Sequence, residues 1–227
     1  MRILAIETSS PRGSVALVEH QRCVAALSHE RENSHVEELP GLIERVLADA
    51  GWAKHSIERV AVGTGPGSFT GLRVGVALAQ GISEGLEVPL VGVCSLAAMA
   101  GAVPEAVSGV RCPVLDARRG EVFFGLYSAD GTELHPPSVM AAAELPTWLP
   151  AESSIIWLGA ACALIPGAGT AYLDPDSLLP HARWVGLAGA SAGVAQVARP
   201  IYLRPGVTTP PLFGRRLLAP ELDRSNG

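Results

Sequence analysis

The segment that most constrains the fold is glycine-rich and spans residues 63–75, with the sequence GTGPGSFTGLRVG. It follows an apolar run of strand length, Arg59–Val62, and leads into a helical pattern that begins at Phe69 or Thr70 and continues to about Leu86. The sequence therefore predicts a strand, a tight loop and a helix in immediate succession. Backbone N–H groups in such a loop can approach an anion at the helix N-terminus.

This glycine-rich segment does not match the common nucleotide-binding loops. It lacks the Gly-Lys-Ser/Thr ending of a P-loop, and its third glycine falls in the wrong place for a dinucleotide fingerprint. The other interpretation is structural, because Gly71 and Gly75 lie four residues apart on one helix face. A bare face of this kind lets another helix approach closely. The spacing favours close packing and leaves anion binding open.

Short apolar runs at the N-terminus predict a β-meander. Strands are expected at Arg2–Ile6, Ser14–Val18 and Cys23–Ser28, separated by turn-forming residues. A helix then starts at an N-cap, Ser34, and stops at Gly51. Later strands are expected at 88–93, 113–115, 121–127 and 155–158, and a last helix at 184–197. A meander followed by alternating helices and strands predicts an α/β fold with a mixed sheet.

Composition restricts the classes of function. Seventeen basic and 22 acidic residues give a net charge of −5, and Lys54 is the only lysine. Proteins that grip a phosphate backbone unaided carry clustered basic residues, so direct nucleic-acid binding is disfavoured. The cysteines form no CxxC pair and no two histidines are four residues apart, so no metal site is predicted. No run reaches the roughly 18 apolar residues that cross a bilayer, and a cytoplasmic protein is expected.

Two other segments place polar side chains beside strands. Glu7, Thr8, Ser9 and Ser10 follow the first strand and could hold a metal-bound phosphate, or form a solvated turn with local hydrogen bonds. The residues 116–120, DARRG, form a charged turn in which an exposed ion pair contributes little to stability.

Several of these segments recur together, in order, in one known family. They are LAIETS at 4–9, GPGSFTGLR at 65–73, VGV at 91–93 and LDARRGEV at 115–122. In these segments the chain resembles TsaB, also called YeaZ, over roughly residues 1–128, most specifically at the glycine loop. PIYLR at 200–204 is similar to the closing strand of that family, whereas the likeness between 129 and 199 is weak.

The resemblance implies an actin-like fold of the ASKHA, ribonuclease H-like class. Such a fold has two lobes of mixed β-sheet flanked by helices, here with a reduced second lobe. A composition shift at 101–109 then places an N-terminal lobe at 1–105, a smaller C-terminal lobe at 106–205 and a flexible tail at 206–227. The implied role lies in forming threonylcarbamoyladenosine next to the anticodon of tRNA.

In the TsaB family the resemblance implies a division of labour. The paralogue TsaD catalyses the transfer, TsaB pairs with it, the ATPase TsaE joins them, and tRNA is contacted only through the complex. The histidines of the His-x-x-x-His metal pair of TsaD fall on Ser95 and Met99 in this chain. A hydroxyl and a thioether cannot replace two imidazoles, so a non-catalytic subunit without a metal is expected.

Two sets of residues follow from that role. A vestigial nucleotide site is expected, with ATP or ADP considered only at the junction with TsaD; its residues are Glu7, Thr8, Ser9, Gly65, Gly67 and Ser68. A helical surface is expected to bind TsaD, or a second copy of the chain when it is alone; its residues are Val36, Leu39, Ile43, Gly71, Val74, Gly75, Leu78 and Ile82.

Other functions stay open. One is an ATP-dependent small-molecule kinase of the actin-like superfamily, which requires an acidic pair for Mg²⁺ and two phosphate loops. Another is a peptidase-like hydrolase, for which the sequence offers no metal pair and no nucleophile with a spaced base. A third is a homodimeric adaptor unrelated to tRNA.

Overall fold

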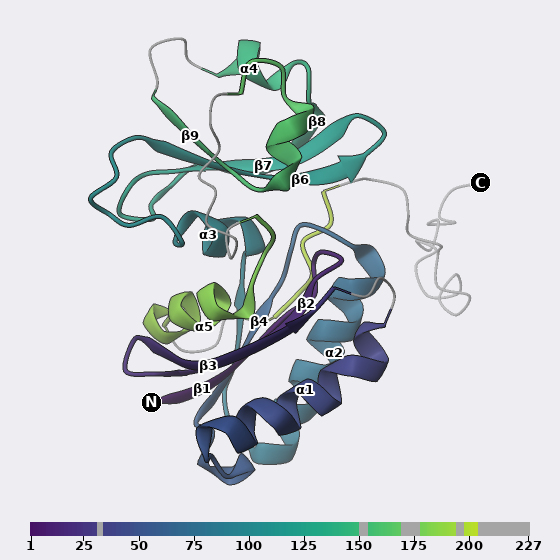
Figure 1. The fold of residues 1–227 in the computed structure, drawn as a ribbon, viewed down its shortest axis with the longest axis vertical. Helices are drawn as coiled ribbons and strands as arrows, with labels where there is room; N and C mark the ends of the chain where they lie inside the picture. The colour runs from purple at the N-terminus through teal and green to yellow at the C-terminus, as the bar shows by residue number, and fades with distance from the viewer. Residues whose placement is uncertain (31–33, 150–153, 169–177, 194–197, 204–227) are drawn as a thin grey trace, which may run out of the picture.

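A computed structural model describes residues 1–30, 34–149, 154–168, 178–193 and 198–203, and its first sheet comes from the N-terminal part of the chain. β1 (Arg2–Glu7) pairs antiparallel with β2 (Gly13–Glu19), which pairs antiparallel with β3 (Arg22–His29). Beyond β1, β4 (Arg59–Gly63) and β5 (Leu90–Val93) run parallel to it, giving the order β3-β2-β1-β4-β5 (Figure 1). The predicted meander and mixed sheet are confirmed.

Helices cover both faces of this sheet (Figure 1). α1 (His35–Ala50) and α2 (Phe69–Leu86) pack against one face, where the buried side chains include Leu4 and Ile6 of β1. α5 (Ala182–Ser191) packs against the other face, over Ile3 and Ala5. Successive strand residues point to opposite faces, so an uninterrupted apolar strand such as β1 must be covered on both.

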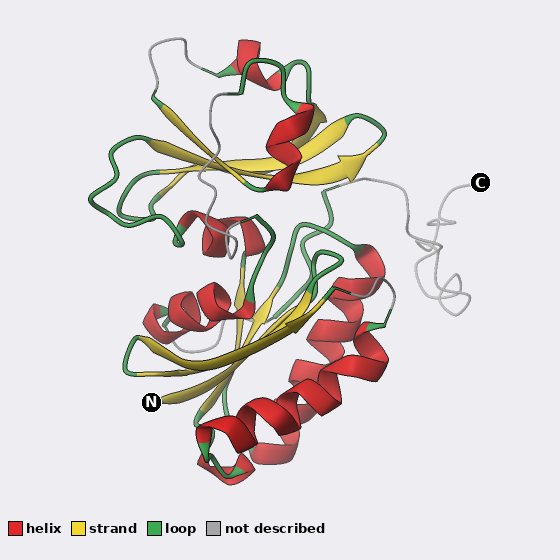
Figure 2. Ribbon diagram, viewed as in Figure 1, coloured by secondary structure: helices red, strands yellow, loops and turns green. Residues whose placement is uncertain are grey.

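The second sheet repeats the plan of the first with one strand fewer (Figure 2). β6 (Val110–Arg118) pairs antiparallel with β7 (Glu121–Tyr127), which pairs antiparallel with β8 (Glu133–Ala141), while β9 (Ile155–Leu158) is parallel to β6. Its order β8-β7-β6-β9 matches β3-β2-β1-β4, and no counterpart of β5 occurs within the described residues. α4 (Leu145–Trp148) and the 3₁₀ turn η2 (Ala160–Leu164) lie against this sheet.

A short helix joins the two lobes. α3 (Ser95–Ala100) buries Leu96 and Met99 against Tyr127 and other residues of the second sheet. Arg111, only 2% exposed, donates from Nη1 to the Ala100 carbonyl at 3.2 Å and from Nη2 to the Pro104 carbonyl at 3.0 Å. A buried guanidinium therefore holds the end of α3 and the start of the connection to the second lobe.

The chain returns to the first lobe at α5. Added Cβ atoms at Gly186 and Gly189 would lie 2.6 Å from Val18 Cγ2 and 2.8 Å from Ala61 Cβ, so these glycines allow α5 to lie close against the sheet. The last helix is confirmed, but it spans 182–191 rather than 184–197, and its packing corrects the expected consecutive lobes. Residues 194–197 and the expected tail at 206–227 lie outside the described residues.

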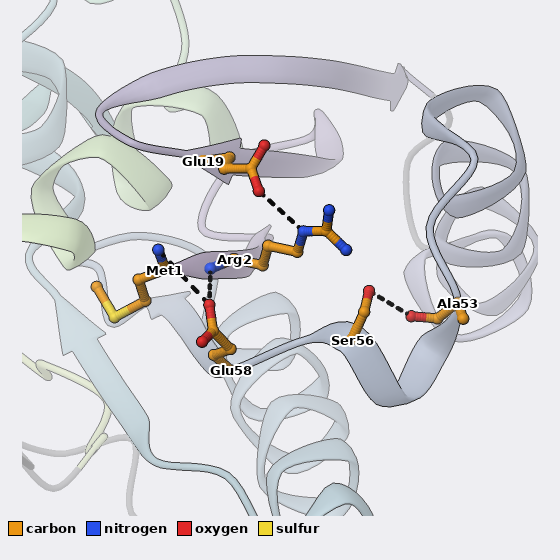
Figure 3. A network of polar contacts seen from close by, with 6 residues as sticks. All are labelled: Met1, Arg2, Glu19, Ala53, Ser56 and Glu58. Atoms are coloured by element: carbon orange, nitrogen blue, oxygen red, sulfur yellow. Dashed lines mark hydrogen bonds and ion pairs between the residues drawn. The ribbon is translucent and has the colours of Figure 1, made fainter.

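Polar contacts tie the start of β1 to the turn before β4 (Figure 3). The backbone N–H of Arg2 donates to Glu58 at 2.6 Å, and its Nε donates to Glu19 at 2.9 Å. The same guanidinium lies 4.9 Å from the centre of the Trp52 ring. The adjoining 3₁₀ turn η1 (Lys54–Ser56) is closed by Ser56 Oγ, which donates to the Ala53 carbonyl. Among the described helices, none is both long and apolar enough to cross a membrane.

Candidate functional site

A cleft of about 730 Å³ lies between the two sheets. Its first wall is formed by the β1–β2 turn, the glycine loop and the start of α2, and its second by the end of β6 and η2. Residues 201–203 close one side. Of the expected nucleotide-site residues, only Ser9, Gly67 and Ser68 line the cleft.

The glycine loop packs directly on the β1–β2 turn. The backbone N–H of Ser68 donates to the Ser9 carbonyl at 2.7 Å, and a Cβ at Gly67 would lie 2.1 Å from that same oxygen. Ser68 also caps α2, since its Oγ accepts from the Gly71 N–H at 3.2 Å. Both segments predicted to meet a phosphate are brought together, but part of their hydrogen-bonding capacity is used between themselves.

Gly71 and Gly75 face Thr8 inside the first lobe. A Cβ at Gly71 would lie 2.1 Å from the Thr8 carbonyl oxygen, and one at Gly75 would lie 2.2 Å from Thr8 Oγ1. Thr8 Oγ1 also donates to the Gly71 carbonyl at 2.8 Å. The expectation that these two glycines expose a bare face to a partner is wrong, because that face packs against the end of β1.

Glu7 lies behind the wall of the cleft and is fully buried. Its Oε1 accepts from the Ser9 N–H at 2.6 Å, and its Oε2 accepts from Ser95 Oγ at 2.7 Å. Burial raises the pKa of the Glu7 carboxyl, and the hydrogen bonds from Ser95 and Ser9 offset this only in part. In this arrangement both carboxyl oxygens bind protein donors rather than facing a ligand in the cleft.

Ser95 and Met99, which were expected to replace the two histidines of the paralogue, are both part of the core. Ser95 Oγ accepts from the Gly65 N–H at 3.1 Å while it donates to Glu7, and the Ser95 N–H donates to the Gly65 carbonyl at 2.8 Å. Met99 is fully buried, with its terminal methyl facing Gly159. Within the described residues, no group of three or more His, Cys, Asp or Glu side chains could hold a metal ion.

The charged segment at the end of β6 is a further part of the site. Asp116 and Arg118 line the cleft opposite the glycine loop. Asp116 Oδ1 accepts from the Arg118 N–H at 2.6 Å, and Arg118 adopts a left-handed conformation with φ of +67°. The signal that could have identified it is the repeat, since β6 holds in the second sheet the place that β1 holds in the first, and the residues that end β6 and those that follow β1 both line the cleft.

A pair of histidines was also missed, of which His35 lines the cleft. His35 Nε2 lies 3.1 Å from the Ser10 carbonyl oxygen, and His35 Nδ1 lies 3.1 Å from His29 Nε2. Because a carbonyl oxygen only accepts hydrogen bonds, His35 Nε2 must carry the hydrogen. In a neutral His35 ring, Nδ1 is then the acceptor, and His29 Nε2 is the donor. The pair fixes the start of α1 against the β1–β2 turn.

Residues 189–193 read GASAG, which matches the Gly-x-Ser-x-Gly pattern of a nucleophile elbow. This motif was missed in the sequence. Ser191 ends α5, is exposed and accepts from Gln21 Nε2 at 2.9 Å. A nucleophile elbow instead requires a sharp turn from a strand into a helix. This motif therefore does not support the peptidase-like alternative.

The expected partner residues are split between surface and core. Val36 is 66% exposed, and Val74 is half-buried at the edge of the cleft, whereas Leu39 is fully buried. Ile43, Leu78 and Ile82 meet at an apolar groove of about 350 Å³ between α1 and α2, here called the α1–α2 groove. Its lining residues are Leu4, Pro40, Ile43, Glu44, Leu47, Lys54, Ile57, Leu78, Ile82, Gly85 and Leu86.

The strand orders and the interlobe cleft define an actin-like protein of the ASKHA, ribonuclease H-like class with a reduced second lobe. A family model described as "TsaD: tRNA N6-adenosine threonylcarbamoyltransferase" matches residues 28–151, more than half of the chain. The chain therefore belongs to this family, on the branch of the TsaB (YeaZ) proteins.

Individual relatives agree with that assignment. The chain is 36% identical over 128 residues to the Bacillus subtilis "tRNA threonylcarbamoyladenosine biosynthesis protein TsaB", covering 56% of this chain and 55% of that one. It is 37% identical over 131 residues to the Escherichia coli protein of that name, covering 57% and 56%. YeaZ from Pseudomonas aeruginosa superposes with a TM-score of 0.75 at 27% identity, covering 89% of this chain and 99% of that one. In sequence, the chain spans about half the length of the curated relatives it matches.

Proposed function

We propose that this chain is a non-catalytic partner subunit of TsaD in the formation of threonylcarbamoyladenosine in tRNA, and that it works in the cytoplasm. The observation that carries the proposal is the start of α3. Ser95 is bound to Glu7 and Gly65, and Met99 is buried, at the positions where the catalytic paralogue is expected to have its metal ligands. Contact with a partner, rather than chemistry of its own, is then the role left to the chain.

The α1–α2 groove is the proposed contact surface for TsaD. Its lining is mainly apolar, with Glu44 and Lys54 joined by a 3.3 Å ion pair. Added Cβ atoms at Gly81 and Gly85 would meet nothing within 4 Å, so these two glycines, rather than Gly71 and Gly75, form the bare outer face of α2. Small residues let a partner helix approach closely and fill the groove with its own side chains.

The test is copurification with TsaD from the same genome, followed by mass spectrometry of tRNA from cells that depend on this chain. The wild-type chain should form a complex and restore the modified adenosine. Gly81→Leu should abolish both, because its side chain occupies the outer face of α2. The matched control is Gly193→Leu, which also alters a glycine with open space around it, at a site beyond α5. Unimpaired binding by Gly81→Leu would remove the proposed surface, and failure of the wild type to bind would refute the partner role.

The remaining partner and cofactor assignments belong to the same proposal. The isolated chain is proposed to use the α1–α2 groove for a homodimer, and TsaE to join only after TsaD. ATP or ADP is proposed to bind only at the junction with TsaD, because the Ser68 amide and Glu7 are already engaged internally. Light scattering after gel filtration, with and without TsaD and ATP, tests these assignments. Binding of tRNA by the chain alone, measured by gel shift, would contradict the indirect role.

A kinase of the actin-like superfamily is the second candidate function. The observation in its favour is the Asp116 turn, which faces the glycine loop across the cleft as a second acidic element. Against it, Glu7 is buried and does not line that cleft. Turnover of ATP by the purified chain with a small-metabolite acceptor would favour this candidate over the partner role.

A further inference from the structure

The last described segment of the chain forms one side of the interlobe cleft. Residues 198–203 run from the first lobe towards the second (Figure 1), and the backbone N–H of Ile201 donates to the Thr64 carbonyl at 2.8 Å. Tyr202 is held in place as well, because its Oη accepts from Arg73 Nε at 3.2 Å. Ile201 and Tyr202 line the cleft, as does the residue that follows them. The rest of the chain therefore starts at the wall of the cleft.

The lining around this point is mainly apolar, with aromatic rings on both sides. Phe69 comes from the first lobe and Phe123 from the second, and the Phe69 ring lies 5.1 Å from that of Tyr202 between centres. Tyr202 is 45% exposed and Val36, at the same cleft, is 66% exposed. An open apolar surface of this kind marks a binding site, and aromatic-lined grooves suit extended segments that contain proline.

The chain itself supplies a segment of that kind. The 24 residues at 204–227 include the run PPLFGRRLL at 210–218, in which two adjacent prolines precede two apolar pairs, Leu212-Phe213 and Leu217-Leu218. Segments that stay solvated are poor in large apolar and aromatic side chains. Adjacent prolines favour an extended backbone, which lowers the entropy lost when such a segment binds. This run therefore has the chemistry of a ligand for an aromatic-lined groove.

Tethering makes this segment the favoured occupant. Leu212 follows Leu203 by nine positions, and nine extended residues span about 30 Å, more than enough to cross a cleft of about 730 Å³. A short tether of this kind gives an effective concentration on the order of 1 mM. Even a modest affinity for the apolar wall is then enough to keep the segment in the cleft of its own chain.

We propose that residues 207–218 bind in the interlobe cleft of their own chain, with Leu212 and Phe213 against its aromatic lining. The bound segment occupies the space that a nucleotide would need, so that ATP or ADP enters only when the segment is displaced. The inference goes beyond the partner role and does not depend on it.

Trypsin tests the proposal in the intact chain, because the bond after Arg215 lies inside the proposed segment. Each cleavage rate is divided by that of a peptide with the same 204–227 sequence, and circular dichroism checks the folding of every variant. The wild type should be cleaved at least tenfold more slowly than its peptide. Leu212→Ser combined with Phe213→Ser should abolish this protection, whereas Leu222→Ser, outside the segment, should keep it.

A second pair of variants probes the wall of the cleft. Ala160 is exposed and lines the cleft, so Ala160→Trp fills space that the segment needs and should also abolish the protection. The matched control is Ala26→Trp, which alters an exposed alanine of β3 outside the cleft lining and should leave the protection unchanged.

The other outcomes overturn the inference, each in a different way. Cleavage of the wild type at the rate of its peptide would show that the segment is not bound and would support the flexible tail expected from the sequence. Protection that Ala160→Trp leaves intact would place the segment outside the cleft. Protection that rises with protein concentration would assign it to the cleft of a second copy. TsaD is absent from these measurements, so their failure is distinct from failure of the proposed function.

Discussion

Two glycines of α2 provide a direct test of how this helix is seated. Gly71 and Gly81 are both helical, but a Cβ at Gly71 would lie 2.1 Å from the Thr8 carbonyl oxygen, whereas one at Gly81 would meet nothing within 4 Å. Alanine is favoured over glycine inside a helix by about 1 kcal/mol. Gly81→Ala should therefore raise the free energy of unfolding by about that amount.

Gly71→Ala should do the opposite. Overpacking of this kind costs about 1–3 kcal/mol, and displacing Thr8 puts its hydrogen bond to the Gly71 carbonyl at risk, a loss of about 1 kcal/mol. After subtracting the helical gain, the free energy of unfolding should fall by about 1–3 kcal/mol, so the two variants should differ by about 2–4 kcal/mol. For a domain of this size, that corresponds to a difference in Tm of about 5–15 °C.

Urea unfolding followed by far-ultraviolet circular dichroism and by tryptophan fluorescence measures this difference. Coincident curves from the two probes establish that one transition is being compared. Thr8→Val in the wild-type background provides a control, because it removes the hydroxyl and keeps the volume near the helix. Equal stability of Gly71→Ala and Gly81→Ala would refute the close approach of α2 to the end of β1.

Two more predictions concern buried charge. Burial raises the pKa of Glu7 in the folded state, so its contribution to stability is present below the unfolded pKa and is lost as pH rises through the folded pKa. Urea midpoints of the wild type should therefore decline across this interval more than those of Glu7→Gln, and parallel pH profiles would contradict the burial of a titrating carboxyl. Arg111→Met should lower the free energy of unfolding by about 2 kcal/mol by leaving the Ala100 and Pro104 carbonyls without their donor. Limited proteolysis should then cut near residues 101–109 faster than in the wild type, and an unchanged rate would refute the clamp.

The local elements could be read from the sequence because each depends on neighbouring residues. The first strands are short apolar runs separated by turn-forming residues, and the glycine loop marks the start of α2, so both were predicted within a few residues. The prediction of a capping box at the start of α1 was less accurate. The Ser34 side chain makes no capping bond to the first turn, even though Ser34 and Glu37 have the spacing of a capping box.

The orientation of α2 could not be predicted in the same way. Helical spacing shows that Gly71 and Gly75 share a face, but it does not show whether that face meets the sheet or the solvent. The answer depends on Thr8, which lies more than sixty positions away in the sequence and reaches both glycines. For the same reason the exposure of Gly81 and Gly85 could not be predicted, because the open space around them depends on how the lobe is assembled.

Contacts between distant segments account for the other site residues that were missed. Asp116 gains its importance from facing the glycine loop across the cleft, and His35 from meeting His29 of another element. In the sequence, Arg73 is part of the glycine-rich motif. Only the fold brings it against Tyr202, which lies far along the chain. None of these pairs shares a periodic pattern that a sequence window could detect.

The late position of α5 has a consequence for the order in which the protein can fold. The strands that carry Ile3, Ala5 and Val18 are synthesised first, yet the helix that covers them occupies residues 182–191. While the ribosome builds the entire second sheet, one apolar side of the first remains uncovered. A nascent chain of this design therefore keeps half of its first core open to chaperones until α5 has been synthesised.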